Sequence, residues 1–351
     1  MSSEEMSSLD RVLCTLGHKE PDRVPFFLLA TMHGARELGM TQSEYFSKGE
    51  NVARGQLKML EKYGHDCLCN IFYAPLEIEA WGGEVIFRED GPANSGRPFI
   101  KNHGDIESLE PPEVANSPEL NEVFKATKLL FEAKGGKVPI IGVVMSPFSL
   151  PVMQMGFDHY LDLLCDEPEL FWRLMKVNQE FCVEWANAQL EAGATAICYF
   201  DPMSSSTIIP RELYQETGFK LAKETIARIK GPTATHFASG RCLPIVDDVA
   251  QTGTAIIGTS ILEDLGDLKK ASKGRLTLLG NLNGITMRKW TPAQAEEEVK
   301  KAIARGGPGG GFILSDNHGE IPLQVPEETL MAVSRAARKW GRYPLDWIDG
   351  Q

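Results

Sequence analysis

Short apolar runs alternate with amphipathic stretches along most of this chain. Residues 292–307 illustrate the amphipathic stretches: Thr291 and Pro292 are a helix start, acidic residues fill the first turns, and Gly306 and Gly307 end the pattern. Apolar strands that alternate with helices indicate parallel strands joined by crossovers, and eight such strands can close a barrel. The eight runs begin at Val24, Cys67, Val138, Thr195, Thr233, Ala255, Leu276 and Gly311.

Two stretches interrupt this rhythm. Residues 79–100 contain Gly-Gly and Asp-Gly turns and predict a hairpin excursion, and residues 146–192 predict a loop followed by two helical stretches. Insertions that follow barrel strands usually shape the substrate cavity. We therefore expect an α/β fold, a TIM (β/α)8 barrel with an N-terminal extension and insertions at the barrel mouth, and interpret residues 1–351 as one domain. A doubly wound open sheet is the main alternative.

Four of the apolar runs end in polar residues. In a TIM barrel the carboxyl ends of all strands share one rim, and active sites lie there. Each residue also has a simpler interpretation: Asp201 as a turn or helix cap, His236 as a core histidine, and Asn283 as part of an Asn-Gly turn. The polar ends are Asp201 with three following serines, His236 with Ser239, Asn281 with Asn283, and Asp316 with Asn317 and His318.

Composition narrows the class of protein. The chain has 351 residues, of which 42% are hydrophobic and 24% charged, as in ordinary globular domains. A net charge of −12 argues against nucleic acid as a partner, because phosphate binding needs a basic surface. No apolar run is long enough to span a membrane, and the acidic, serine-rich N-terminus does not resemble a secretory signal. The seven cysteines are scattered, which suits reduced thiols and a cytoplasmic location.

Metal binding is not favoured by the spacing of possible ligands. Cys67 and Cys69 alternate along a strand between apolar neighbours, so we interpret them as core or barrel-lining residues. His236, Cys242 and His318 could supply two nitrogens and a sulfur, but Cys242 lies beyond Arg241 at the start of a probable helix. Neither the glycine-rich signature of a dinucleotide-binding fold nor the nucleophile elbow of a serine hydrolase occurs.

Five motifs together resemble one superfamily. The motifs occur in a fixed order, cover nearly the whole chain, and are specific as a set. They resemble the uroporphyrinogen decarboxylase superfamily, which includes corrinoid-dependent methyltransferases, and the resemblance implies a TIM barrel. The motifs are EPDRVPF, ICYFDPMSSSTIIPRELY, THFASG, GNLNG and GFILSDNHGEIPLQVPEETLMAVSRAAR.

Departures from the decarboxylase pattern argue against porphyrin chemistry. The decarboxylases share an Asp at the second barrel strand that contacts the pyrrole nitrogens of the substrate. Ala74 stands at the matching position here, next to Tyr73. They also have an arginine-rich motif after the first strand, where this chain offers only Arg36. An enclosed polycarboxylate needs paired cations. We therefore do not expect this chain to decarboxylate a porphyrin precursor.

A second departure concerns zinc. The coenzyme M methyltransferases of the superfamily share a His-x-Cys motif after the fifth strand and a Cys after the last strand, and the resemblance implies that these residues bind a zinc ion that holds the acceptor thiol. Here His236 is kept and Ala238 takes the place of the first cysteine. The position that corresponds to the last cysteine falls near His318. The missing thiolates suggest an acceptor that needs no metal, since a secondary amine already carries a usable lone pair. The N5 nitrogen of tetrahydrofolate is such an acceptor, and Asp and Asn side chains suit the edge of its pterin ring.

The resemblance thus implies a corrinoid-dependent methyltransferase, similar to those that serve demethylation of methylated amines or betaines. It would move a methyl group between methylcobalamin, carried by a partner corrinoid protein, and tetrahydrofolate, without a metal. Three alternatives remain: a zinc-dependent thiol methyltransferase that uses His236, His318 and either Glu320 or Cys242; a lyase acting on a smaller tetrapyrrole-like acid; and a non-catalytic corrinoid-binding protein. The expected catalytic residues are His236, Asp201 and Asn281, and the expected substrate-binding residues are Asp316, Asn317, His318, Asn283, Tyr73 and Ser239.

Overall fold

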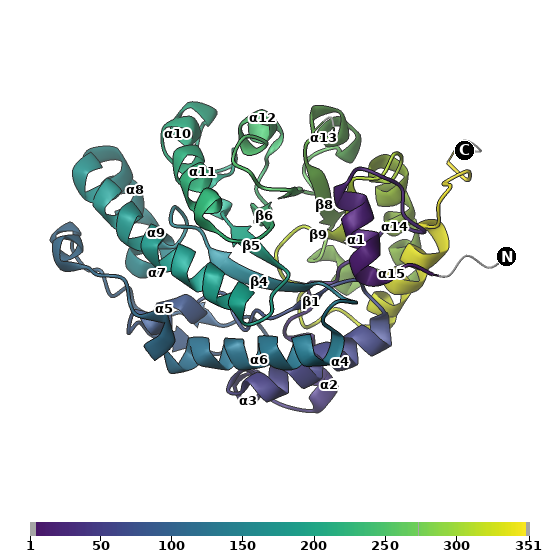
Figure 1. Cartoon of the computed structure of the whole chain (residues 1–351), viewed down its shortest axis with the longest axis horizontal. Coiled ribbons are helices and arrows are strands. Elements are labelled where there is room, and N and C mark those ends of the chain that lie inside the picture. The colour runs from purple at the N-terminus through teal and green to yellow at the C-terminus, as the bar shows by residue number, and fades with distance from the viewer. Residues whose placement is uncertain (1–4, 273, 349–351) are drawn as a thin grey trace.

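A parallel sheet forms the centre of the molecule (Figure 1). The computed structural model describes residues 5–272 and 274–348. Within these residues seven strands pair in the order β1-β4-β5-β6-β7-β8-β9, and every pair is parallel. Seven of the eight predicted runs are therefore confirmed as parallel strands. The strands are β1 (Leu68–Cys69), β4 (Ile140–Met145), β5 (Ala196–Phe200), β6 (Thr233–His236), β7 (Ile256–Gly258), β8 (Thr277–Leu282) and β9 (Phe312–Asp316).

The run that begins at Val24 occupies the eighth place without forming a regular strand. Phe26 makes one parallel bridge to Leu314 of β9, and the amide of Phe27 donates to the carbonyl of Leu314 (2.8 Å). On its other side, the carbonyl of Phe26 accepts from the amide of Asp66, two residues before β1 (2.8 Å). Pro25 lacks an N–H, which shortens the ladder that this segment can form. The segment joins β9 to β1, so the TIM barrel is confirmed and the prediction of eight regular strands is wrong by one.

Helices cover the outside of the sheet (Figure 1). The start and end predicted for one of them are confirmed: the hydroxyl of Thr291 accepts from the amide of Gln294, Pro292 opens the helix, and Gly307 caps its end. The outer helices are α4 (Gly49–Tyr63), α6 (Pro118–Lys134), α9 (Pro168–Glu191), α11 (Gly218–Arg228), α13 (Leu265–Ser272), α14 (Pro292–Gly306) and α15 (Glu327–Trp340).

Shorter elements lie in the segments between them. Strands β2 (Val85–Ile86) and β3 (Asn94–Ser95) pair antiparallel within residues 79–100, where the turn residues predict a hairpin. None of the helices within the described residues is long and apolar enough to cross a membrane. The short helices are α1 (Ser8–Leu16), α2 (His33–Leu38), α3 (Gln42–Phe46), α5 (Leu76–Ala80), α7 (Pro151–Met155), α8 (Phe157–Asp166), α10 (Arg211–Glu216) and α12 (Val246–Val249), and the 3-10 turns span His103–Ser108, Val114–Asn116, Pro202–Ser204, Leu243–Ile245 and Thr286–Lys289.

A buried ion network attaches the N-terminal segment to the barrel. The Asp66 carboxylate accepts from the guanidinium groups of Arg11 (2.7 Å) and Arg23 (2.7 Å) and from the backbone amide of Phe26 (2.9 Å). Arg11 also pairs with Asp22 (2.6 Å). The EPDR motif therefore has a structural role: it anchors α1 and holds the irregular segment in the eighth place of the barrel.

Candidate active site

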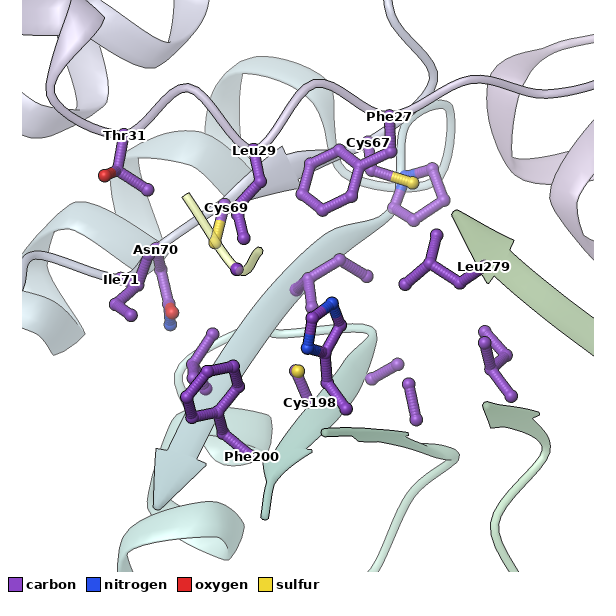
Figure 2. A pocket seen from close by; sticks show the side chains of 18 of the residues that line it. Phe27, Leu29, Thr31, Cys67, Cys69, Asn70, Ile71, Cys198, Phe200 and Leu279 are labelled. Atoms are coloured by element: carbon purple, nitrogen blue, oxygen red, sulfur yellow. The ribbon is translucent and has the colours of Figure 1, made fainter. Parts of the chain in front are cut away.

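The barrel encloses a cavity of about 380 Å³ that reaches the carboxyl ends of the strands. Figure 2 shows side chains from several strands pointing into it, including Phe27, Cys69, Cys198 and Phe200. Most of the wall is apolar. The polar residues that line the cavity near its mouth are Thr31, Tyr73, His236, Ser315, His318 and Glu320.

His236 ends β6 and is held as a neutral imidazole. Its Nδ1 accepts from the backbone amide of Ala238 (3.0 Å), so the ring proton of the neutral form lies on Nε2. Phe200 stacks on the ring, with centroids 5.4 Å apart and planes 20° from parallel. Burial, together with the neighbouring His318, lowers the pKa of His236 to about 4. A Cβ at Gly258 would lie 2.7 Å from the ring, so glycine is needed there to admit the imidazole.

The segment after β9 carries His318 to the cavity. With its amide nitrogen toward His318, Asn317 donates to Nδ1 of that ring (2.7 Å) and to the carbonyl of Leu282 (3.1 Å). Asp316 accepts from the amide of His318 through Oδ2 (3.0 Å), whereas its buried Oδ1 has no partner among the described residues. Burial raises the pKa of Asp316 to about 6. Asp316 and Asn317 thus hold the segment in place, and His318 rather than either of them lines the cavity.

Glu320 is the carboxyl group that lines the cavity mouth. It accepts from the hydroxyl of Thr31 and from the backbone amide of Met32 (3.2 Å). Burial, and secondly the nearby charge of Asp316, raises the pKa of Glu320 to about 8. From the sequence, Glu320 is expected only as a possible zinc ligand. Its position two residues after His318 is the signal that places it near the rim.

Asp201 lies at the rim but its side chain faces a neighbouring loop. The fully buried carboxylate accepts from the hydroxyl groups of Ser146 (2.5 Å) and Ser149 (2.7 Å), in the loop that follows β4. Ser149 accepts in turn from the amide of Met203 (3.1 Å). Asp201 is absent from the cavity wall. The structure therefore gives this residue a loop-holding position, which is neither a place on the cavity wall nor the side-chain helix cap of the simpler interpretation.

Asn281 and its neighbours also turn away from the main cavity. The amide of Asn281 donates to the carbonyl of Ser260 (2.9 Å), and the residue lines a separate hollow of about 150 Å³ with Arg305. Asn283 accepts from the amide of Thr286 (3.0 Å), as expected of a turn residue. Ser239 is exposed and does not line the cavity.

Tyr73 does line the cavity, with its hydroxyl donating to Glu79. Of the nine residues expected from the sequence, the fold brings together His236, His318 and Tyr73. It adds Glu320, Thr31 and Phe200 to them, from the segments after β9, before α2 and at the end of β5. The other six remain outside this group: Asp201, Asn281, Asn283, Ser239, Asp316 and Asn317.

The described part of the cavity wall carries acidic side chains but no lysine or arginine. Glu77 and Glu320 line it, and none of the described lining residues is a lysine or an arginine. Arg36, the one cation after the first barrel segment, donates instead to the carbonyl groups of Leu323 (3.3 Å) and Val325 (3.1 Å). A wall of this kind cannot pair the charges of a polycarboxylate, and it suits a neutral ligand with hydrogen-bond donors on its edge.

The residues present do not form the zinc-binding set of the thiol methyltransferases. No three His, Cys, Asp or Glu side chains within the described residues are placed to hold one metal ion. Nδ1 of His236 is taken by Ala238, and Nδ1 of His318 by Asn317. Cys242 is buried beside Glu263 and is not part of the cavity wall. Cys67 and Cys69 line the barrel interior, as the sequence predicts.

Comparisons with known proteins agree with this architecture. The uroporphyrinogen decarboxylase (URO-D) family matches residues 7–340. A uroporphyrinogen decarboxylase from Alkalilimnicola ehrlichii is 30% identical, over 91% of this chain and 90% of its own length. The methylcobamide:CoM methyltransferase MtaA from Methanosarcina barkeri is 25% identical, over 95% of this chain and 98% of its own length. A methyltransferase from Methanosarcina mazei has the same fold, with a TM-score of 0.86, 21% identity, and 95% and 99% of the two chains covered. The chain therefore belongs to the uroporphyrinogen decarboxylase family.

Proposed function

We propose that this protein is a corrinoid-dependent methyltransferase that moves a methyl group between a methylcobamide on a partner protein and tetrahydrofolate. The observation that carries the proposal is the cavity mouth: a neutral His236 and the carboxyl group of Glu320 face an apolar chamber without a lining cation. A family relative with similar coverage is a methylcobamide methyltransferase. The same mouth disfavours a porphyrin precursor, whose carboxylates would meet Glu320 and Glu77 instead of arginines.

The pterin ring would meet the mouth with two kinds of surface, a flat aromatic face and an edge of N–H groups. Its flat face would lie against the aromatic rings of Phe200 and Tyr73, which gain from stacking on another ring. Its N–H groups would meet the carboxyl group of Glu320, which lines the mouth. Placing donors against this buried carboxyl group relieves its desolvation cost, so the site favours a neutral, donor-rich ring.

Two side chains would then orient the pterin ring and accept the proton of N5. His236 presents its Nε2–H to a ring acceptor and turns N5 toward the incoming methyl group, because Nδ1 is fixed by Ala238. When N5 forms its bond to the methyl carbon, the nitrogen must release its proton. Burial raises the pKa of Glu320 to about 8, so its carboxylate form increases as the pH approaches 8. That carboxylate can accept the proton, and the resulting acid returns it in the reverse direction. Corrinoid chemistry supplies the methyl group itself.

The rim offers a surface for the corrinoid-bearing partner. Exposed apolar side chains follow four consecutive strands, β5 to β8, on the side of the barrel where the cavity opens. Several exposed apolar residues on one rim suit an interaction site, whereas a single one is ordinary. They are Ile208 (42% exposed), Leu243 (36%), Leu262 (62%) and Ile285 (46%), and we call them the apolar rim.

The test is methyl transfer with purified components. Incubated with methylcobalamin and tetrahydrofolate, the protein should form 5-methyltetrahydrofolate at the rate at which methylcobalamin is consumed. Asn283→Ser, which keeps a turn-capping oxygen away from the cavity, should behave as the unmodified protein. Methyl transfer to coenzyme M or another thiol, with none to tetrahydrofolate, would overturn the proposal, as would decarboxylation of a porphyrinogen under the same conditions.

A further inference from the structure

The barrel interior below the mouth is hollow, although TIM barrels are normally filled by bulky side chains. The cause lies in β5 and β6, whose inward positions carry small residues. In the register of the sheet, Ala196 and Cys198 of β5 lie beside Ile141 and Val143 of β4. Cys198 also lies beside Ala234 of β6. All of these residues line the cavity. Three small side chains at neighbouring registers leave space that larger residues occupy in a packed barrel.

The wall of this lower chamber is uncharged and largely apolar, and Thr195 and Thr233 add hydroxyl groups to it. Many of its aliphatic side chains remain partly accessible although they lie inside the barrel. The thiol groups among them are neutral, because burial raises the pKa of Cys69 and of Cys198 to about 12. The wall is built from Phe27, Leu29, Cys67, Cys69, Ile141, Val143, Cys198, Ile256, Leu279 and Ile313.

The chamber extends to the amino-terminal end of the barrel. Helix α1 lies there, beside β9, and contributes Leu9, Val12, Leu13 and Leu16 to the wall. Leu13 is 54% exposed and Thr195, at the start of β5, is also exposed. Residues exposed to solvent therefore border the chamber at the end opposite to His236.

We propose that this lower chamber binds an uncharged apolar ligand, an alkyl chain or a fused aromatic ring, that enters beside Leu13. An apolar cavity of about 150 Å³ stays dry and binds benzene. The whole cavity, mouth and lower chamber together, measures about 380 Å³ and most of its wall is apolar, so a two-ring aromatic molecule fits within its apolar part. A pterin is not that ligand, because its polar edge finds partners only at the mouth. The inference goes beyond the proposed methyl transfer and does not rest on it.

The test uses two probes of the same shape and different charge, measured by calorimetry without a methyl donor or folate. Naphthalene should bind the unmodified protein, and 2-naphthalenesulfonate should bind at least tenfold more weakly, because the wall offers no cation to a buried anion. Ala196→Phe fills the chamber and should weaken naphthalene binding at least tenfold. Ala293→Phe adds the same ring at an exposed position of α14 and should leave binding unchanged.

Three outcomes would overturn the inference: no naphthalene binding to the unmodified protein, equal binding to Ala196→Phe, or equal affinity for the sulfonate. If Ala196→Phe does not fold, Cys198→Leu adds less volume to the same wall and takes its place, with the same weakening expected. Because the measurement needs no methyl transfer, a failed methyltransferase assay leaves its result interpretable.

Discussion

The backbone nitrogen of Ala238 lies 3.0 Å from Nδ1 of His236 and donates a hydrogen bond to it. The family resemblance implies a zinc-binding cysteine at this position in the thiol methyltransferases, whereas alanine offers no thiolate. The backbone amide, which any residue but proline would provide, fixes the imidazole as a donor through Nε2. We therefore propose that His236 orients a neutral substrate.

Replacing His236 should slow turnover more than it weakens binding. We expect His236→Gln to lower kcat by about 10²-fold, the usual loss for one positioned catalytic group, with KM for tetrahydrofolate changed severalfold at most. Because the pKa of His236 is lowered to about 4, the ring stays neutral above pH 5.5. Steady-state rates between pH 5.5 and 8 should therefore show no inflection from this residue. An inflection near pH 6.5 that disappears in His236→Gln would contradict the assignment.

Glu320 and Asp201 should separate into a ligand-binding and a structural carboxyl group. Glu320→Ala should weaken tetrahydrofolate binding by about 1–3 kcal/mol, the cost of leaving a buried donor of the ligand without its partner, as measured by calorimetry. Asp201→Asn should leave that affinity nearly unchanged and lower the free energy of unfolding instead, because its partners are Ser146 and Ser149. The reverse pattern would return Asp201 to the substrate site.

The apolar rim should matter only when a protein delivers the methyl group. We expect Leu262→Asp to raise KM for the corrinoid protein about tenfold or more, since a buried unpaired charge is costly at an interface. Rates with free methylcobalamin should stay the same. Phe131→Asp changes an apolar residue of similar exposure (53%) near the end of α6 and serves as the control. Equal losses with free and protein-bound methyl donor would point to a folding defect and not to docking.

Glu77 should make the protein less stable as the pH rises. Burial raises the pKa of this carboxyl from 4.5 to about 8, so the folded protein holds a proton that the unfolded chain has lost between these values. Stability then falls with rising pH over that window, by up to about 1.4 kcal/mol per pH unit. Glu77→Gln should remove this contribution. Between pH 5 and pH 8 the free energy of unfolding of the variant should then fall less than that of the unmodified protein. Urea unfolding at several pH values measures it, and identical slopes for both proteins would contradict the prediction.

The buried ion network around Asp66 should be expensive to break. Asp66→Ala leaves Arg11 and Arg23 buried without their shared carboxylate, and we expect a loss of about 3–5 kcal/mol in the free energy of unfolding. Glu298→Ala removes an exposed ion pair with Lys301 and should cost about 0–1 kcal/mol. Chemical denaturation of both variants gives the comparison, and similar losses in the two would mean that burial adds nothing to the Asp66 pairs.

Much of the fold follows from local sequence pattern. Apolar runs of strand length, separated by capped amphipathic helices such as the one that starts at Thr291, were enough to predict a parallel barrel, because period and capping depend on neighbouring residues. The run at Val24 was predicted as a strand for the same reason. Its ladder is reduced to one bridge, because Pro25 and the ion network around Asp66 act together on that segment.

The candidate site depended on contacts between distant parts of the chain. Sequence placed Asp201, Asn281 and His236 at strand ends, but where a side chain points after a strand ends is set by the loop it meets. Asp201 meets Ser146 and Asn281 meets the carbonyl of Ser260, while His236 finds room above Gly258. The sequence by itself determined which residues reach the rim. Only the tertiary structure decided which of them face the cavity, brought Glu320 beside Thr31, and left the interior hollow, because these features require packing between segments far apart in the chain.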